Sequence, residues 1–137
     1  MVCSMRTKIL FFLLILTLIN SNFAFAISII SVEITNVKLE YQCENSHIYG
    51  NINIPDGAII GISIYDDEEN EIGQPIETKV NNNTFSERLD INMTQSIVNV
   101  VFIIKSSQDV FKKTRIFISK HIGDNHVRID KRVMVVK

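Results

Sequence analysis

The stretch IYGNINIPDGAIIGISIY, residues 48–65, decides the fold class of this chain. Isoleucine occupies even-numbered positions in both halves of it. An apolar residue at every second position is the pattern of a strand with one buried face. Between the halves, Pro55 presets φ and Gly57 permits a positive φ, so Pro-Asp-Gly predicts a turn. We therefore expect a hairpin-like pair of strands over residues 48–54 and 59–65.

The alternation continues on both sides of this stretch. Residues 32–41 alternate in one phase up to Asn36 and in the other from Val37 onward. A phase shift of one residue inside a strand predicts a β-bulge or a strand that changes sheets. Residues 97–104 are apolar on both faces, as in a central strand. Further strands are expected at 76–80, 85–91, 111–119, 127–129 and 133–136, with a turn at 81–83 because asparagine tolerates left-handed backbone.

Short strands of this number, with turn signals at intervals of about 8–12 residues, are typical of an antiparallel sandwich or barrel. The two-sheet sandwich is favoured because one strand is apolar on both faces. Its core is expected to contain Ile52, Ile62, Val100 and Phe102. The chain after position 26 is long enough for one domain with one core, residues 27–137.

Three motifs describe the turns of this region: Gly50–Gly57, which reads GNINIPDG, then Ile60–Ile64, and Asn83-Thr84-Phe85. They resemble the turn and strand motifs of bacterial exported immunoglobulin-like sandwich domains. The resemblance implies an all-β chain forming a single antiparallel immunoglobulin-like β-sandwich of about seven strands after a cleaved signal peptide. Because the motifs describe turns, the resemblance carries over no catalytic residue.

Residues 1–26 have the composition of a secretory signal peptide. Arg6 and Lys8 precede an apolar run at Ile9–Ile19, and Ala24-Phe25-Ala26 is a small-x-small cleavage signal. A transmembrane helix needs roughly 17–25 residues, and this run is shorter. We expect cleavage after Ala26, export to the periplasm or beyond the cell, and no membrane span afterwards. An uncleaved anchor is the alternative.

Charge is distributed unevenly along the chain. From residue 27 to 91 there are 12 acidic and 3 basic residues, whereas from 92 to 137 there are 3 acidic and 9 basic residues. A domain without a strong positive charge is not expected to bind nucleic acid. The asymmetry predicts either acidic and basic strands paired across a sheet or a basic face that binds a protein or an anionic envelope polymer.

Within the expected strand 111–119, Lys113 and Arg115 share one face while Lys112 points away. Lys113 and Arg115 are therefore the candidates for partner binding. The alternative is that they form the solvated face of an edge strand, where lysine discourages aggregation.

The densest cluster of possible oxygen ligands is the polar loop between two expected strands. Calcium takes six to eight oxygens, but the loop lacks the spacing of an EF-hand. We expect a solvated turn and assign no metal ligand, with weak calcium binding as the alternative. The residues concerned are Asp66, Asp67, Glu68, Glu69 and Glu71.

Cys43 has the parity of Leu39 and Tyr41, which predicts a buried thiol on one strand face. An intermolecular disulfide and a reactive thiol are the alternatives. His121 and His126 flank an expected turn, but a zinc or copper site needs about three or four ligands. We therefore expect these histidines to be solvated polar residues.

No motif for a nucleophile, a phosphate-binding loop or a metalloprotease occurs in the sequence. The sequence therefore predicts a small exported binding or interaction module, without catalysis and without a cofactor, that contacts its partner through an edge strand or end loops. The alternatives are a secreted hydrolase or accessory subunit of an exported enzyme, and a metal-binding exported protein.

Overall fold

The computed structural model describes residues 26–118 and 126–137, and in these ranges the chain is mostly strand, as predicted. The expected signal peptide lies outside the described residues, apart from Ala26. The elements are β1 (Ser28–Ile30), β2 (Ile34–Glu40), β3 (Ser46–Ile52), β4 (Ile59–Tyr65), β5 (Ile76–Lys79), β6 (Thr84–Leu89), β7 (Ile97–Lys105), α2 (Asp109–Thr114), β8 (Ile116–Ile118) and β9 (His126–Val136).

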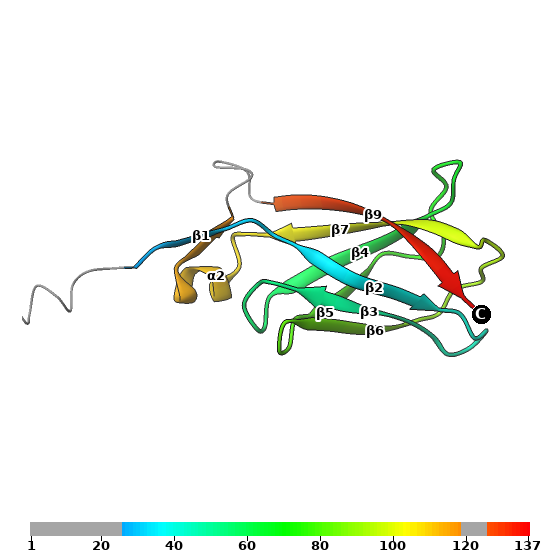
Figure 1. Cartoon of the computed structure of the whole chain (residues 1–137), viewed down its shortest axis with the longest axis horizontal. Helices are drawn as coiled ribbons and strands as arrows, with labels where there is room; N and C mark the ends of the chain where they lie inside the picture. Colours follow the sequence, from blue (N-terminus) through cyan, green and yellow to red (C-terminus); the bar gives the residue numbers. More distant parts are fainter. Residues whose placement is uncertain (1–25, 119–125) are drawn as a thin grey trace, which may run out of the picture.

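Seven strands form one continuous sheet in the order β5-β4-β7-β9-β2-β3-β6. The sheet folds back on itself into two layers, with β9 as the strand that joins them (Figure 1). All pairs are antiparallel except β2 and β9, which run parallel and pair only at Leu39–Val135 and Glu40–Val136. The sheet is therefore mixed, and the expectation of a wholly antiparallel arrangement was wrong at this junction.

The hairpin-like pairing expected for residues 48–54 and 59–65 is also wrong. β3 pairs with β2 and β6, whereas β4 pairs with β5 and β7. The turn at Gly57, with φ of 86°, carries the chain from one layer to the other. Each strand has an inward row of isoleucines, and placing the strands in facing layers buries both rows against each other.

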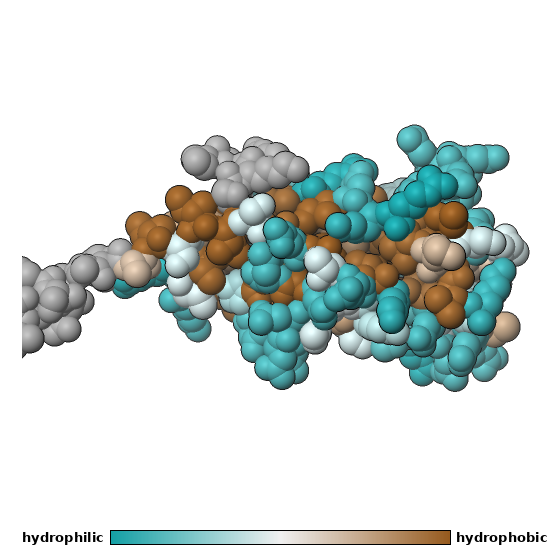
Figure 2. All heavy atoms as spheres, viewed as in Figure 1, coloured by the Kyte–Doolittle hydropathy of each residue, from teal (hydrophilic) through white to brown (hydrophobic). Residues whose placement is uncertain are grey.

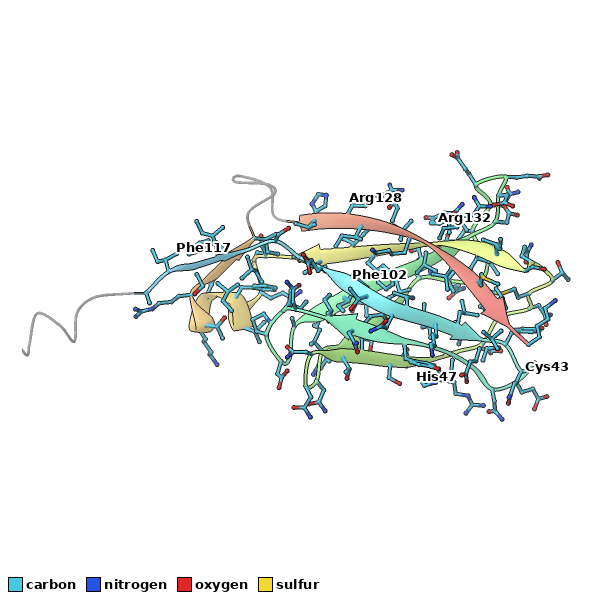
Figure 3. The ribbon with its side chains drawn as sticks, in the orientation of Figure 1. Cys43, His47, Phe102, Phe117, Arg128 and Arg132 are labelled. Carbon is cyan, nitrogen blue, oxygen red and sulfur yellow. The ribbon has the colours of Figure 1, made fainter. Side chains whose placement is uncertain are left out.

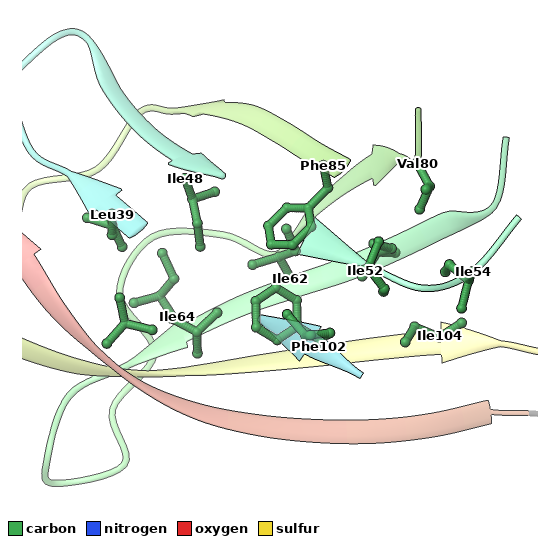
Figure 4. Close-up of a cluster of buried hydrophobic side chains, with 14 of the residues drawn as sticks. Leu39, Ile48, Ile52, Ile54, Ile62, Ile64, Val80, Phe85, Phe102 and Ile104 are labelled. Carbon is green, nitrogen blue, oxygen red and sulfur yellow. The ribbon is translucent and has the colours of Figure 1, made fainter. Parts of the chain in front are cut away.

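The core lies between the layers and is built from the even-numbered side chains of β3, β4 and β7 (Figure 4). Ile52, Ile62, Val100 and Phe102 are all buried, with exposed fractions of 2% or less, which confirms the predicted core. Phe85 of β6 faces Phe102 across the layers. Burial of these large side chains is the main favourable contribution to folding.

Two local predictions about the strands are confirmed. The register of β2 on β3 shifts between Thr35 and Lys38, and Asn36 has a φ of 54°, so the phase shift in the sequence marks a β-bulge. β7 lies between β4 and β9, as expected for a central strand.

The expected strand over 111–119 is wrong in its first part and confirmed at 116–118. Residues 109–114 form α2, which ends at Arg115 in the left-handed region with φ of 54°, and Ile116–Ile118, where the described part of this stretch ends, forms β8. Asp109 in the first turn and lysines in the last turn suit the helix dipole. Phe111 faces the core from the helix. The apolar residues of this stretch therefore belong to two elements, α2 and β8, and not to one strand.

β1 and β8 form a separate two-stranded parallel sheet beside α2, at the end of the molecule opposite the C-terminus (Figure 1). The register pairs Ile29 with Phe117 and Ile30 with Ile118. Ile118 is buried in the core, so one face of this small sheet covers one end of the core between the two layers.

Candidate binding face along strand β9

β9 is the longest strand of the described chain, and its two edges differ in how many of their residues are paired with a neighbouring strand. Along one edge it pairs with β7 over nine residue pairs, from Met134 to His126. Along the other edge it pairs with β2 only at Val135 and Val136. Among the described strands, none pairs with this second edge between residues 126 and 134.

The backbone directions along β9 follow from two hydrogen bonds at its end. The N–H of Val135 donates to Ser96 beside β7, at 2.8 Å, and the carbonyl of Val136 accepts from Tyr41, at 2.7 Å. Because successive residues of a strand direct their backbone groups to opposite neighbours, even-numbered residues of β9 face β2. The N–H and C=O groups of Arg128, Asp130 and Arg132 thus point toward β2.

β2 presents a matching edge. The N–H of Glu33 donates to the side chain of Asn53, at 2.7 Å, and the carbonyl of Glu33 accepts from the Asn53 N–H, at 3.3 Å. Glu33 therefore directs both backbone groups toward β3, so those of Val32 and Ile34 face β9 by the same alternation. We call the space between these two edges the β2–β9 seam.

A cavity of about 310 Å³ marks the seam. It combines apolar walls with charged groups at its rim. Its lining residues are Ser31, Val32, Glu33, Ile34, Thr35, Val127, Ile129 and Lys131.

A second, larger groove of about 640 Å³ lies on the outer face of β4, β7 and β9. Lys131 lines both this groove and the seam cavity, so the two flank β9. Figure 3 shows the side chains of Arg128 and Arg132 on this outer face of β9. The groove is lined by Tyr65, Glu69, Asn99, Val101, Arg128, Asp130, Lys131 and Arg132.

The cations of β9 have acidic neighbours, but in solvated positions. Arg128 Nε donates to Asp130 Oδ1 at 2.9 Å, and this carboxylate raises the pKa of the guanidinium. Arg132 Nη2 lies 3.5 Å from Asp67 Oδ1 of the acidic loop. All four side chains are more than 60% exposed. Exposed ion pairs of this kind contribute little to stability, so a ligand can compete for either guanidinium.

The acidic loop is organised by one of its own carboxylates. Asp66 accepts hydrogen bonds from the N–H groups of Glu68 and Asn70, at 2.9 and 2.8 Å. Within the ranges that the structure describes, no three histidine, cysteine, aspartate or glutamate residues are placed to share a metal ion. Glu69 lines the outer groove and Asp67 contacts Arg132, so the loop forms the acidic flank of the basic strand.

The cations selected from the sequence do not share a face. Lys113 is in the last turn of α2 and Arg115 is its left-handed C-cap. Residues two apart on a helix do not face each other, so the strand-face pairing of Lys113 with Arg115 was wrong. The cations that do lie together are those of β9.

Cys43 is exposed, which contradicts the predicted burial. β2 ends at Glu40, and Cys43 has a φ of 35° in the turn that the N–H of Asn45 closes on Gln42, at 2.7 Å. The parity of the strand therefore does not extend to the thiol. His121 lies outside the described residues, and His126 at the start of β9 is exposed.

A polar network on the outer face of β2, β3 and β6 was not anticipated from the sequence. His47 Nε2 lies 2.5 Å from Ser86 Oγ, and the Tyr49 hydroxyl donates to Glu40 at 2.9 Å. A hydroxyl beside an imidazole is the start of a nucleophilic site, but Glu40 bonds Tyr49 and does not orient the imidazole. Only the register of β3 on β6 brings Ser86 close to His47, and no local motif signals it.

Comparisons of the chain with protein-family models, with curated proteins and with solved structures give no match. No helix in the described part of the chain is long and apolar enough to cross a membrane.

Proposed function

We propose that this chain is an exported, non-catalytic binding module with an immunoglobulin-like sandwich fold, and that it binds an extended acidic polypeptide along β9. The fold assignment is supported by the pairing pattern, in which β3 pairs with β6, β4 with β7, and β7 with β9. These are the neighbours expected for the B–E, C–F and F–G pairs of such a sandwich.

The observation that carries the proposal is the β2–β9 seam. It has two strand edges whose backbone groups point toward each other without a described strand between them. An extended peptide supplies N–H and C=O groups at the spacing that such edges require, and adding a strand to a sheet is a recurrent mode of peptide recognition. A polysaccharide or polyphosphate cannot pair with these groups in register.

Charge favours an acidic peptide over a neutral one. β9 carries Arg128, Lys131 and Arg132 against one acidic residue, Asp130. Because the neighbouring carboxylates are solvated, an incoming acidic side chain can replace Asp67 beside Arg132 without burying an unpaired charge.

The first test addresses charge. A fluorescent peptide of alternating glutamate and valine is titrated against the protein at low and high salt. Arg132→Glu should weaken binding about two- to fivefold, the scale of an exposed ion pair, and salt should weaken it further. Lys79→Glu, an exposed lysine on β5, is the matched control and should leave binding unchanged. Binding that is indifferent to salt and to Arg132→Glu would contradict the acidic preference.

The second test addresses the backbone. Asp130→Pro removes an N–H that faces β2 and not β7, so the β7–β9 pairing should survive. Asp130→Asn removes the same charge and keeps the N–H. If a strand is added at the seam, the proline variant should bind up to about tenfold more weakly than the asparagine variant, as expected for one lost hydrogen bond. Equal affinity, with salt dependence retained, would contradict strand addition and indicate that the peptide is bound by charge alone, as any anionic polymer could be.

The alternatives from the sequence remain separate proposals. A hydrolase would use Ser86 and His47, and Ser86→Ala would abolish its activity toward ester substrates. A metal-binding protein would use the acidic loop, in which Asp66 already accepts two backbone N–H groups. Neither alternative makes use of the β2–β9 seam.

A further inference from the structure

The small sheet of β1 and β8 presents an apolar patch to solvent. Ile27, Ile29 and Phe117 are 61%, 66% and 58% exposed. Ile29 and Phe117 are direct partners across the parallel pair, and Ile27 has the parity of Ile29. We call these three residues the β1 patch; apolar residues are visible at the β1 end of the molecule in Figure 2.

The opposite face of the same two strands packs on the domain. Ile118 is buried and Ile30 and Ile116 pack against the core. The patch is therefore held in place by buried neighbours and does not need a partner to fold. Contiguous exposed apolar residues on a soluble domain mark interaction sites more often than isolated ones do.

The chain that precedes the patch indicates what covers it. The apolar run Ile9–Ile19 ends eight residues before Ile27. At roughly 3.3–3.6 Å per extended residue, eight residues span at most about 29 Å. Whenever the apolar run is in a bilayer, the β1 end of the molecule must lie within this distance of the membrane surface, whereas the C-terminus lies at the opposite end of the molecule (Figure 1).

We propose that the β1 patch contacts the lipid bilayer while the chain is joined to its N-terminal apolar run, with Ile27, Ile29 and Phe117 entering the interfacial region. Aromatic and aliphatic side chains bind at this depth by burying apolar area. A second copy is the less suitable occupant, because a stable interface uses about 20–30 residues a side and the patch has three. The tether also keeps the local concentration of the patch at the bilayer high, so few contacts suffice.

The test uses the absence of tryptophan from the chain, which makes one introduced tryptophan a clean reporter. Full-length Phe117→Trp is incorporated into vesicles of phosphatidylethanolamine and phosphatidylglycerol. Its emission should shift to shorter wavelength and be quenched by brominated lipids. Met134→Trp is the matched control, since Met134 is 73% exposed on β9 near the C-terminal end, and its emission should show neither effect.

Adding Ile29→Asp to Phe117→Trp should abolish the shift and the quenching, while circular dichroism shows an unchanged fold because Ile29 is exposed. A Phe117→Trp emission that vesicles and brominated lipids leave unchanged would overturn the proposal. So would a shift that disappears when the protein is diluted in lipid to less than one chain per vesicle, because that dependence identifies a second copy as the occupant.

Discussion

The ring of Phe85 meets the ring of Phe102 edge-on, with centroids 5.3 Å apart and ring planes at 65°. Phe85 lies on β6 and Phe102 on β7, so the contact joins the two layers of the folded sheet (Figure 4). Edge-on aromatic pairs add about 0.5–1.5 kcal/mol to the contribution of buried area. This pair holds together strands that are far apart in the order of the sheet.

Phe102→Ala should lower the free energy of unfolding by about 3–5 kcal/mol, because it removes a fully buried ring and leaves a cavity. Urea denaturation followed by circular dichroism measures the loss. Phe102→Leu, which fills more of the space, should cost less. A loss below about 1 kcal/mol for the alanine variant would mean that the ring is not in the core.

Two strand glycines should respond differently to alanine. A Cβ at Gly50 would lie 2.8 Å from Cζ of the buried Phe85, whereas a Cβ at Gly61 would lie at ordinary van der Waals distances from Ile103, 3.6 Å from its carbonyl oxygen and 3.8 Å from its Cβ. Gly50→Ala should therefore cost about 1–3 kcal/mol through overpacking. Gly61→Ala should be neutral or stabilise by about 0.5–1 kcal/mol, because glycine is unfavourable within a strand. Thermal denaturation of both variants decides this, and equal effects would contradict the geometry at Gly50.

Gln108 anchors the start of α2 to β4. Its side-chain oxygen accepts from the Ile59 N–H at 2.7 Å, and its side-chain nitrogen donates to the Ile59 carbonyl at 2.8 Å. Gln108→Ala should lower the free energy of unfolding by about 1–3 kcal/mol, since it removes two hydrogen bonds. Gln108→Glu keeps the acceptor and loses the donor, so its cost should be smaller. Hydrogen exchange at the Ile59 amide, which should quicken in the alanine variant, reports on the same contact.

Calcium should leave the melting temperature unchanged if the acidic loop is a turn closed by Asp66. Ligand at 100 times its dissociation constant would add about 2.7 kcal/mol of stability. Asp66→Asn weakens the hydrogen bonds that residue 66 accepts from the N–H groups of Glu68 and Asn70. This substitution should lower the melting temperature equally with and without calcium. A calcium-dependent rise that Asp66→Asn with Glu68→Gln abolishes would establish the metal-binding alternative.

The pKa of Tyr49 should lie above its ordinary value of 10.0, because its hydroxyl donates to Glu40 and the carboxylate disfavours ionisation. A folded-state pKa above the unfolded one stabilises the fold below the unfolded pKa, and this contribution is lost as the pH rises through the folded pKa. Glu40→Gln should bring the Tyr49 pKa back toward 10.0 in an NMR titration. Glu77→Gln, on the other layer, is the control and should leave the Tyr49 titration in place.

The sequence alone determined the local structure of this protein wherever periodicity and turn chemistry act over a few residues. The even-numbered isoleucines predicted β3 and β4, and the phase shift after Asn36 predicted the bulge. The expected asparagine turn is confirmed by Asn82 and Asn83, which have φ of 51° and 58°. The core residues followed from the same parity, because the face on which an apolar side chain lies is fixed by its position in the strand.

Only the tertiary structure decided which strands pair, because pairing depends on contacts between residues far apart in sequence. Period-two patterns are identical for a hairpin and for two facing layers, so β3 and β4 were wrongly paired. The proximity of His47 to Ser86 and the open edge of β9 are likewise products of strand order. The pattern of residues 111–119 predicted one strand, but Phe111 and Ile118 both reach the core once the chain turns at Arg115. The candidate binding face could therefore not be predicted from the sequence, because it depends on the order of the seven strands in the sheet.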